Sequence, residues 1–209
     1  MMTHLPTRTP NDFKSFQYLD QGVTMPKNLA SLLLYVYSMW VVVSQPCPTY
    51  TALSAASLNP EEYRGRWYFS AAVSGREEEL QWFRMMDSGV YTMQTTAVPQ
   101  TVLLNVDIRI GNNCMRSSMT YKVLSGRNDV QLEGRPQRQT FFWGGAQHND
   151  SDYIIVQETE PAPAALDVYT LFGRKKVLPD DVIKDFQEIL ACQGMTAFFR
   201  LPQTQELCS

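Results

Sequence analysis

Histidine is scarce in this chain, and its scarcity removes several kinds of chemistry. Only His4 and His148 occur among the 209 residues. His4 lies in a polar N-terminal stretch, so the folded part has at most one histidine, which excludes a two-histidine metal site. A Ser-His-Asp triad would need His148, which lies in the polar turn AQHNDSD and is interpreted as an exposed loop residue. The composition therefore offers little for enzymatic catalysis.

Long runs of lysine and arginine are absent as well. The formal net charge is −3, and 19% of the residues are charged. Proteins that bind nucleic acid normally present a basic face, so no nucleic-acid partner is expected. Nothing in the sequence indicates a metal or nucleotide cofactor. A chain of this length with 44% hydrophobic residues suits one globular domain plus an extension.

Cysteine occurs only four times, at Cys47, Cys114, Cys192 and Cys208. No two cysteines have the CxxC spacing of zinc sites or thioredoxin-like redox sites, so both kinds of site are excluded. An even number at wide spacing suits two structural disulfides in an oxidising compartment, if the chain is secreted. Three connectivities remain open at this point.

No apolar run reaches the ~20 residues that a membrane-spanning helix needs. The longest, Leu29–Val43, is uncharged and follows Lys27, which is typical of a signal-peptide core. The residues before Met25 are polar, so we expect Met25 to be the initiator, and Ser44 is a tolerable cleavage position.

These features divide the chain into three parts. Residues 1–24 form a polar extension, 25–44 a signal peptide or retained signal anchor, and 45–209 the folded domain. The triplet Asn149-Asp150-Ser151 is an N-glycosylation acceptor in a polar turn, consistent with secretion.

The folded domain reads as a series of short strands. The clearest is VLLNVDIRI, in which apolar residues from Val102 to Ile110 alternate with largely polar ones over nine positions. Eight strands separated by hairpin-scale turns predict an all-β, antiparallel up-and-down barrel, with a β-sandwich as the alternative. The predicted strands are Trp67–Val73, Val90–Thr96, Val102–Ile110, Ser118–Leu124, Val130–Glu133, Thr140–Trp143, Tyr153–Glu158 and Leu166–Phe172.

Two helical segments are expected beside the strands. The charged connection Arg76–Met86 suits a helical turn. After Pro179, acidic residues complement a helix N-terminus, an apolar stripe runs from Val182 to Leu190, and Gly194 offers a stop. This C-terminal helix is expected to pack on the outer face of the sheet.

The first strand opens with the triplet Gly65-Arg66-Trp67. A GxW opening, eight strands and one late helix together resemble the lipocalins. That resemblance implies that Trp67 closes the floor of the barrel and that Arg174, in TLFGRKK, lies across the indole. An arginine stacked on an indole contributes on the order of 1–2 kcal/mol when partly desolvated.

Several ordered blocks resemble the apolipoprotein M family more closely. These are GRWYFSAA, EEEL, LEGRPQRQT, LPDDVIKDFQEILAC and AFFRLPQTQELCS. The resemblance runs from about Cys47 to the C-terminus. It implies a secreted, monomeric barrel that carries sphingosine 1-phosphate and associates with high-density lipoprotein through a retained signal peptide, here Leu29–Val43.

The resemblance also implies the disulfide pairing. It pairs Cys47 with Cys192 and Cys114 with Cys208. The family's third bridge is absent, because Val182 occupies one of its positions and no cysteine lies near WGGAQ.

The ligand tail is expected inside the barrel, against Val102, Leu104, Val106, Ile108, Ile110, Met119, Val123, Ile154 and Val156. For the head group, the resemblance assigns a phosphate contact to Arg135, an amine contact to Glu158, and aromatic contacts to Tyr121 and Tyr91.

Other head-group positions depart from the family. Ser117 replaces a second phosphate-contacting arginine, Met119 a tryptophan, Phe172 a tyrosine, and Val168 another arginine. Arg116 is adjacent to Ser117, but neighbouring strand residues point to opposite faces, so only a bulge would turn it inward.

Three alternatives remain. The same fold could carry a fatty acid or retinoid, because the phosphate site has lost cations. A lipocalin enzyme that isomerises prostaglandins would need a free thiol in the cavity. A surface-interaction module would have a filled core and no ligand.

Overall fold

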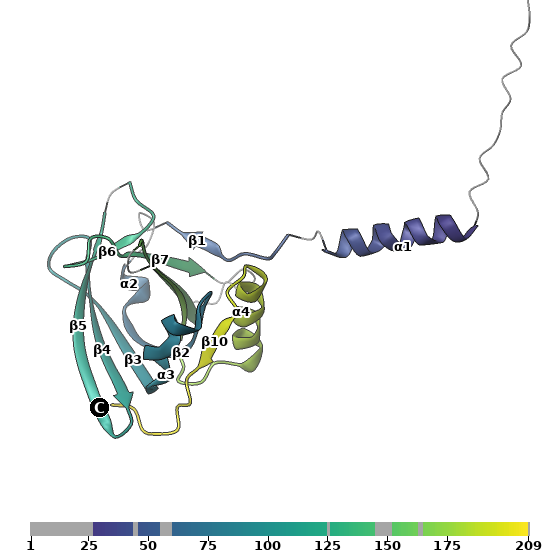
Figure 1. Cartoon of the computed structure of the whole chain (residues 1–209). Coiled ribbons are helices and arrows are strands. Elements are labelled where there is room, and N and C mark those ends of the chain that lie inside the picture. Colours follow the sequence, from purple (N-terminus) through teal and green to yellow (C-terminus); the bar gives the residue numbers. More distant parts are fainter. Residues whose placement is uncertain are drawn as a thin grey trace, which may run out of the picture. The chain divides into compact units, whose positions relative to one another are not determined.

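A computed structural model describes residues 27–43, 46–54, 60–124, 126–144, 152–162 and 165–208 (Figure 1). The chain divides into two compact units, Met1–Pro46 and Cys47–Ser209. The described part of the first unit contains helix α1, Lys27–Val43. The second unit contains the barrel and its surrounding helices.

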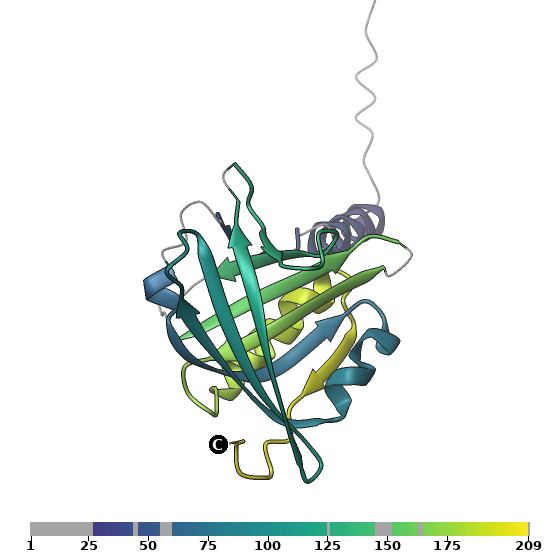
Figure 2. The same cartoon turned by 90° about the vertical axis from the view of Figure 1, so that its left-hand side faces the viewer.

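Eight antiparallel strands form a closed barrel (Figure 2). Each strand pairs with the next along the chain, and β9 pairs with β2 to complete the circle. The barrel prediction is therefore confirmed over the sandwich. The strands are β2 (Gly65–Ser74), β3 (Met86–Thr95), β4 (Thr101–Ile110), β5 (Asn113–Val123), β6 (Val130–Leu132), β7 (Gln139–Gly144), β8 (Tyr153–Glu160) and β9 (Leu166–Gly173).

The alternation in β4 has the predicted effect. Val102, Val106 and Ile108 are buried in the barrel core, whereas Asp107 is paired with Arg116 on the outer face. Opposite Val106, β3 places Tyr91 and β5 places Ser117. Because directly paired residues share a face of a sheet, these three side chains face the barrel interior.

The segment GNNCMRS, which the sequence analysis treats as a turn, is mostly strand. Asn113 already pairs with Ile110, so the connection between β4 and β5 is a tight hairpin. Gly111 has a φ of 55°, a left-handed conformation that glycine adopts without steric cost. β5 therefore starts five residues earlier than the prediction of Ser118.

The sequence analysis did not predict three short elements. They are β1 (Thr51–Leu53), which pairs with β7; α2 (Pro60–Tyr63); and β10 (Ala197–Arg200), which pairs with the second half of β2. Segments of three or four residues carry too little periodicity to be recognised. The predicted helical turn between the first two barrel strands is confirmed as η2 (Glu77–Leu80) and α3 (Gln81–Arg84).

Helix α4 (Asp180–Cys192) packs outside the barrel, as predicted (Figure 1). Ile183, Phe186 and Leu190 are buried on one side of it. They pack against outward-facing side chains of the sheet, including Val73 and Ile155. This second apolar layer leaves the barrel interior free for a ligand.

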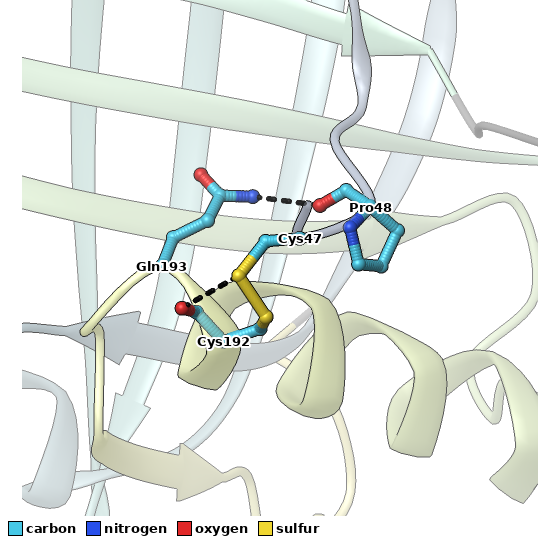
Figure 3. Close-up of a disulfide and its surroundings, with 4 residues drawn as sticks. All are labelled: Cys47, Pro48, Cys192 and Gln193. Atoms are coloured by element: carbon cyan, nitrogen blue, oxygen red, sulfur yellow. Dashed lines mark hydrogen bonds between the residues drawn. A yellow bond between two sulfur atoms is a disulfide. The ribbon is translucent and has the colours of Figure 1, made fainter. Parts of the chain in front are cut away.

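Two disulfides take up all four cysteines, with the pairing that the family resemblance implies. Cys47 is bonded to Cys192 at the end of α4 (Figure 3), and Cys114 in β5 is bonded to Cys208. They close loops spanning 145 and 94 residues, respectively. Chain-entropy arguments give roughly 4–5 kcal/mol for each loop of this length.

Asp87 fastens the C-terminal tail to the barrel. Its carboxylate accepts hydrogen bonds from the backbone N–H groups of Thr204 and Gln205, at 3.0 Å each, and from the Thr204 hydroxyl. Burial raises the pKa of Asp87, but these hydrogen bonds outweigh burial and hold the pKa below its ordinary value. The tail is therefore a fixed part of the fold.

Candidate ligand site

The barrel encloses a cavity of about 450 Å³. Its wall is mostly apolar, because alternate residues of every barrel strand point inward. The predicted tail-contacting residues lie in this wall, except Ile110, which packs against the same core without lining the cavity. Lining residues from the predicted set are Val102, Leu104, Val106, Ile108, Met119, Val123, Ile154 and Val156. A cavity of this volume is within the range of small-molecule sites.

Trp67 and Arg174 occupy one end of the barrel, which we call the closed end. The Arg174 guanidinium lies 3.7 Å from the centroid of the Trp67 ring. Arg174 donates hydrogen bonds to the carbonyls of Glu62 at 2.7 Å and Arg64 at 2.8 Å. The Trp67 indole N–H donates to the carbonyl of Tyr63 at 2.7 Å.

Gly65 explains the glycine of the GxW triplet. Its φ is 100°, and a Cβ at this position would lie 3.4 Å from Nη1 of Arg174. A larger residue would therefore be strained in its backbone and would crowd the guanidinium. The triplet supplies the turn and the indole that the closed end needs.

Arg138, Glu158 and Glu160 lie at the other end, and we call them the mouth cluster. Strand β8 begins at Tyr153, opposite Gly173 at the closed end, and finishes at Glu160. Arg138 donates from Nε and Nη2 to one oxygen of Glu160, at 3.1 and 3.0 Å. Its Nη1 lies 3.6 Å from Glu158 Oε2, which is longer than a hydrogen bond.

Glu158 is the carboxylate of the cluster that faces the cavity. Its side chain is 27% exposed, and the Tyr121 hydroxyl donates to Glu158 Oε1 over a long 3.5 Å. Burial raises the pKa of the Glu158 carboxyl above its ordinary value, and the charges of Arg138 and Arg135 and the Tyr121 hydrogen bond oppose that rise. Glu158 is therefore an incompletely compensated carboxylate in a largely apolar wall.

Thr140 adds an unsatisfied polar atom beside Glu158. The two residues are directly paired across β7 and β8, and both line the cavity. Thr140 Oγ1 is buried and has no hydrogen-bond partner within the part of the chain that the structure describes. Buried hydroxyls are normally hydrogen-bonded, so this hydroxyl is available to a polar group of a ligand in the cavity.

The structure brings most of the predicted head-group residues into the cavity wall. These are Glu158, Tyr121, Tyr91, Ser117, Met119 and Phe172, together with Val168. Arg135 is different: it is exposed in the turn before β7 and is not part of the wall. Arg116 points outward and forms an ion pair with Asp107 at 3.0 Å, without a bulge in the pairing of β4 and β5. It therefore does not replace the cation missing at Ser117.

Sequence reasoning missed Arg138 and Thr140. The available signal was the alternation of strand residues: Thr140 and Phe142 of β7 face the cavity, and Arg138, two positions before Thr140, faces it too. The family resemblance drew attention to Arg135, three positions earlier. Two other candidates, His148 and the acceptor Asn149, lie outside the described residues.

The sequence and fold were compared with known proteins. The ApoM domain family matches residues 25–209. Rat (Rattus norvegicus) apolipoprotein M is 28% identical over 188 residues, covering 84% of this chain and 93% of that protein. Mouse (Mus musculus) apolipoprotein M is 27% identical over 183 residues, with the same coverage of each chain.

A solved structure of the siderocalin Ex-FABP shares the fold. The TM-score is 0.57 at 15% sequence identity, and the match covers 70% of this chain and 97% of the siderocalin. That protein is described as functioning through dual ligand specificities. Since the ApoM family model matches the chain from residue 25 to its last residue, the chain belongs to the ApoM family.

Proposed function

We propose that this protein is a secreted carrier that holds one amphipathic lipid in the barrel, of the sphingosine 1-phosphate type. The observation that carries the proposal is the cavity of about 450 Å³, whose apolar wall is interrupted by a charged cluster at one end. An apolar tail gains free energy by leaving water for such a wall. A charged head group needs compensating partners, which the mouth cluster supplies.

The family resemblance supports sphingosine 1-phosphate as the ligand to test first. Glu158 and Tyr121 are in the wall and can meet the amine and hydroxyl groups of such a head group. In the proposed arrangement Arg135 would reach the phosphate from outside the wall, and Ser117 provides no cation where the family has one. In this arrangement the phosphate group has fewer protein contacts than the amine or the tail.

Helix α1 supports association with a phospholipid surface such as that of high-density lipoprotein. After Lys27 it is uncharged, and its large apolar side chains are exposed from Leu29 to Met39. Within the described residues, no helix is both long and apolar enough to cross a membrane. A short apolar helix can still anchor a protein in one lipid layer. We include retention of this segment in the proposal.

The enzymatic alternative lacks its nucleophile. Isomerisation of a prostaglandin by a lipocalin would need a free thiol in the cavity, and all four cysteines are bonded in disulfides. The interaction-module alternative requires a filled core, whereas this core encloses a cavity. Carriage of a lipid is therefore the function that we favour.

The experiment is a tryptophan-fluorescence titration of the full chain with sphingosine 1-phosphate. Trp67 and Trp82 both line the cavity and report its occupation. We expect saturable binding of one lipid per chain. Val106→Trp, which fills the cavity from β4, should abolish binding, whereas Val98→Trp at an exposed site should not. On the unmodified protein, retinol and palmitate are tested as competitors of sphingosine 1-phosphate. Failure of all three lipids to bind would overturn the proposal.

A further inference from the structure

A short linker and a disulfide connect α1 to the barrel. Helix α1 ends at Val43, and Cys47 is four residues further along the chain. Because an extended chain spans about 3.5 Å per residue, this linker spans at most about 14 Å. Cys47 is bonded to Cys192 at the end of α4, and the Gln193 side chain donates to the Pro48 carbonyl at 3.2 Å (Figure 3). A phospholipid layer that holds α1 must therefore lie close to this disulfide.

The disulfide lies near the mouth of the barrel. Strand β2 ends at Ser74, and the pairings of β2 with β9 and of β9 with β8 put Ser74 in register with Glu158 of the mouth cluster. A Cβ on the next residue, Gly75, would lie 3.5 Å from Sδ of Met195. The Cα atoms of Cys192 and Met195, three residues apart, are at most about 11 Å from each other. The linker of α1 therefore joins the barrel beside the mouth end of β2.

Three large apolar side chains are exposed around the same mouth, and we call them the rim patch. They are Trp82, Met85 and Met115, which are 44%, 50% and 48% exposed. Trp82 lies on α3, which connects the mouth end of β2 with β3, and it also lines the cavity. Met85 directly precedes β3, whose first residue pairs with Ile110 of β4, and Met115 pairs with Ile108 of the same strand. Tryptophan favours the boundary between lipid and water, so the rim patch suits contact with a lipid layer.

The charged side chains beside the rim patch are paired with one another. Arg84 forms an ion pair with Glu77. Arg76 forms ion pairs with Glu78 and Glu79. This set has no excess of positive charge, so it favours a zwitterionic layer, such as one of phosphatidylcholine, over an anionic one.

The closed end presents a different surface. Arg64 and Lys175 are exposed there. Two exposed apolar side chains, Val98 and Val177, lie in separate connections, one between β3 and β4 and the other between β9 and α4. Single exposed apolar side chains are normal on a protein surface. They provide matched control sites for the rim patch.

We propose that the barrel docks through the rim patch on the phospholipid layer that holds α1, with the mouth of the cavity toward a phosphatidylcholine surface. The inference rests on the proposed function, a lipid carrier anchored by α1, and adds the face of the barrel that meets the layer. The linker ends near the mouth, and the rim patch surrounds the same mouth. In this orientation the head group of a lipid stays at the interface, and its tail moves between layer and cavity without exposure to water.

The test asks which end of the barrel touches the layer. The full chain is bound to phosphatidylcholine vesicles whose acyl chains carry bromine, which quenches a tryptophan that enters the layer. Trp40→Phe removes the tryptophan of α1 from every sample. We expect the vesicles to quench Trp82, and Trp82→Phe to abolish most of the quenching. Adding Val177→Trp to Trp82→Phe moves the reporter to the closed end, where we expect it to be protected.

Three results would contradict the inference, and flotation of the vesicles distinguishes them. Stronger quenching of the tryptophan at position 177 than of Trp82 would show that the closed end meets the layer. Quenching of neither, with the protein still bound to vesicles, would show that the barrel does not dock, and anchoring by α1 would stand. Absence of vesicle binding would refute anchoring by α1 in the proposed function, and docking with it.

Charged substitutions check the rim patch independently. Met85→Glu combined with Met115→Glu should remove the quenching of Trp82 while the protein stays bound through α1, because a carboxylate is costly in an apolar layer. Val98→Glu combined with Val177→Glu is the matched control and should leave the quenching unchanged. Neither methionine lines the cavity, so the affinity for sphingosine 1-phosphate without vesicles should not change. Undiminished quenching in the rim variant would overturn the docking role of the patch.

Discussion

Each end of the barrel holds one arginine, and the surroundings of the two arginines differ. At the closed end Arg174 contacts an indole face and neutral backbone carbonyls. At the mouth Arg138 is bonded to Glu160 and lies beside Glu158. An arginine with neutral partners stabilises the fold and contributes no charge that a ligand would have to compensate. A cation between two carboxylates leaves a net negative charge facing the cavity, which a ligand can neutralise.

The comparison separates stability from binding. Substitution of Arg174, which does not line the cavity, should change the free energy of unfolding and leave lipid affinity intact. Substitutions in the mouth cluster should change the choice of head group. Five predictions test that separation, in order of expected size.

Trp67→Ala should have the largest effect on stability. Trp67 is almost fully buried, and its removal leaves a cavity and takes away the stacking partner of Arg174. The free energy of unfolding should fall by about 3–5 kcal/mol in denaturant titrations. Trp82→Ala, at a residue that is 44% exposed, is the control, and an equal loss there would contradict the role of Trp67.

Arg174→Gln should destabilise the closed end by about 2–3 kcal/mol, from the lost stacking and charge-assisted hydrogen bonds. The carbonyls of Glu62 and Arg64 would lose their donor. Lipid affinity should stay within about twofold, because no binding contact changes. A tenfold loss of affinity with unchanged stability would reverse the assignment of the two ends.

Asp87→Asn should lower stability at neutral pH by about 1–2 kcal/mol, because the carboxylate that anchors the tail is lost. The sign of its pH dependence follows from its lowered pKa in the folded state. Its contribution is present above the ordinary pKa of about 3.9 and is lost as the pH falls through the lower, folded value. Thermal unfolding between neutral and acidic pH measures this, and Glu188→Gln on the exposed side of α4 is the control.

Glu158→Gln should act in the opposite direction. Because the folded pKa of Glu158 is raised, the empty protein should become less stable as the pH rises from the ordinary glutamate pKa of about 4.3 through the folded value. The variant should lose this dependence and be at least as stable as the parent at neutral pH. Calorimetry on lipid-free protein decides the sign, and a clear destabilisation at neutral pH would show that Glu158 is fully compensated without a ligand.

Arg116→Gln should have the smallest effect. Arg116 is exposed and pairs with Asp107 on the outer face of the barrel. Exposed ion pairs contribute at most about 1 kcal/mol, and most contribute less. Neither lipid affinity nor head-group preference should change, and a loss of phosphate binding would mean that Arg116 reaches the cavity after all.

The sequence predicted the barrel because it contains eight short strand segments separated by hairpin-scale turns. The period-two pattern of β4 predicted its inward residues, and the resemblance predicted that Arg174 lies across the Trp67 indole, where the structure places it. The residues of the mouth cluster were harder to predict, because their identity depends on which residues of the turn before β7 point into the barrel. Resemblance favoured Arg135, whereas the register of β7 puts Arg138 in the wall. The pairing of β10 with β2 depends on a contact more than 120 residues away in sequence, which local patterns do not contain.

The most direct test of the account measures two quantities on two variants of the full chain. For Glu158→Gln and Arg174→Gln, the affinity for sphingosine 1-phosphate and the free energy of unfolding are determined at neutral pH. The account predicts that Glu158→Gln weakens lipid binding about tenfold or more without loss of stability, and that Arg174→Gln lowers stability with lipid affinity nearly unchanged. If both variants changed the same quantity, the two ends would not have separate roles, and the account would be wrong.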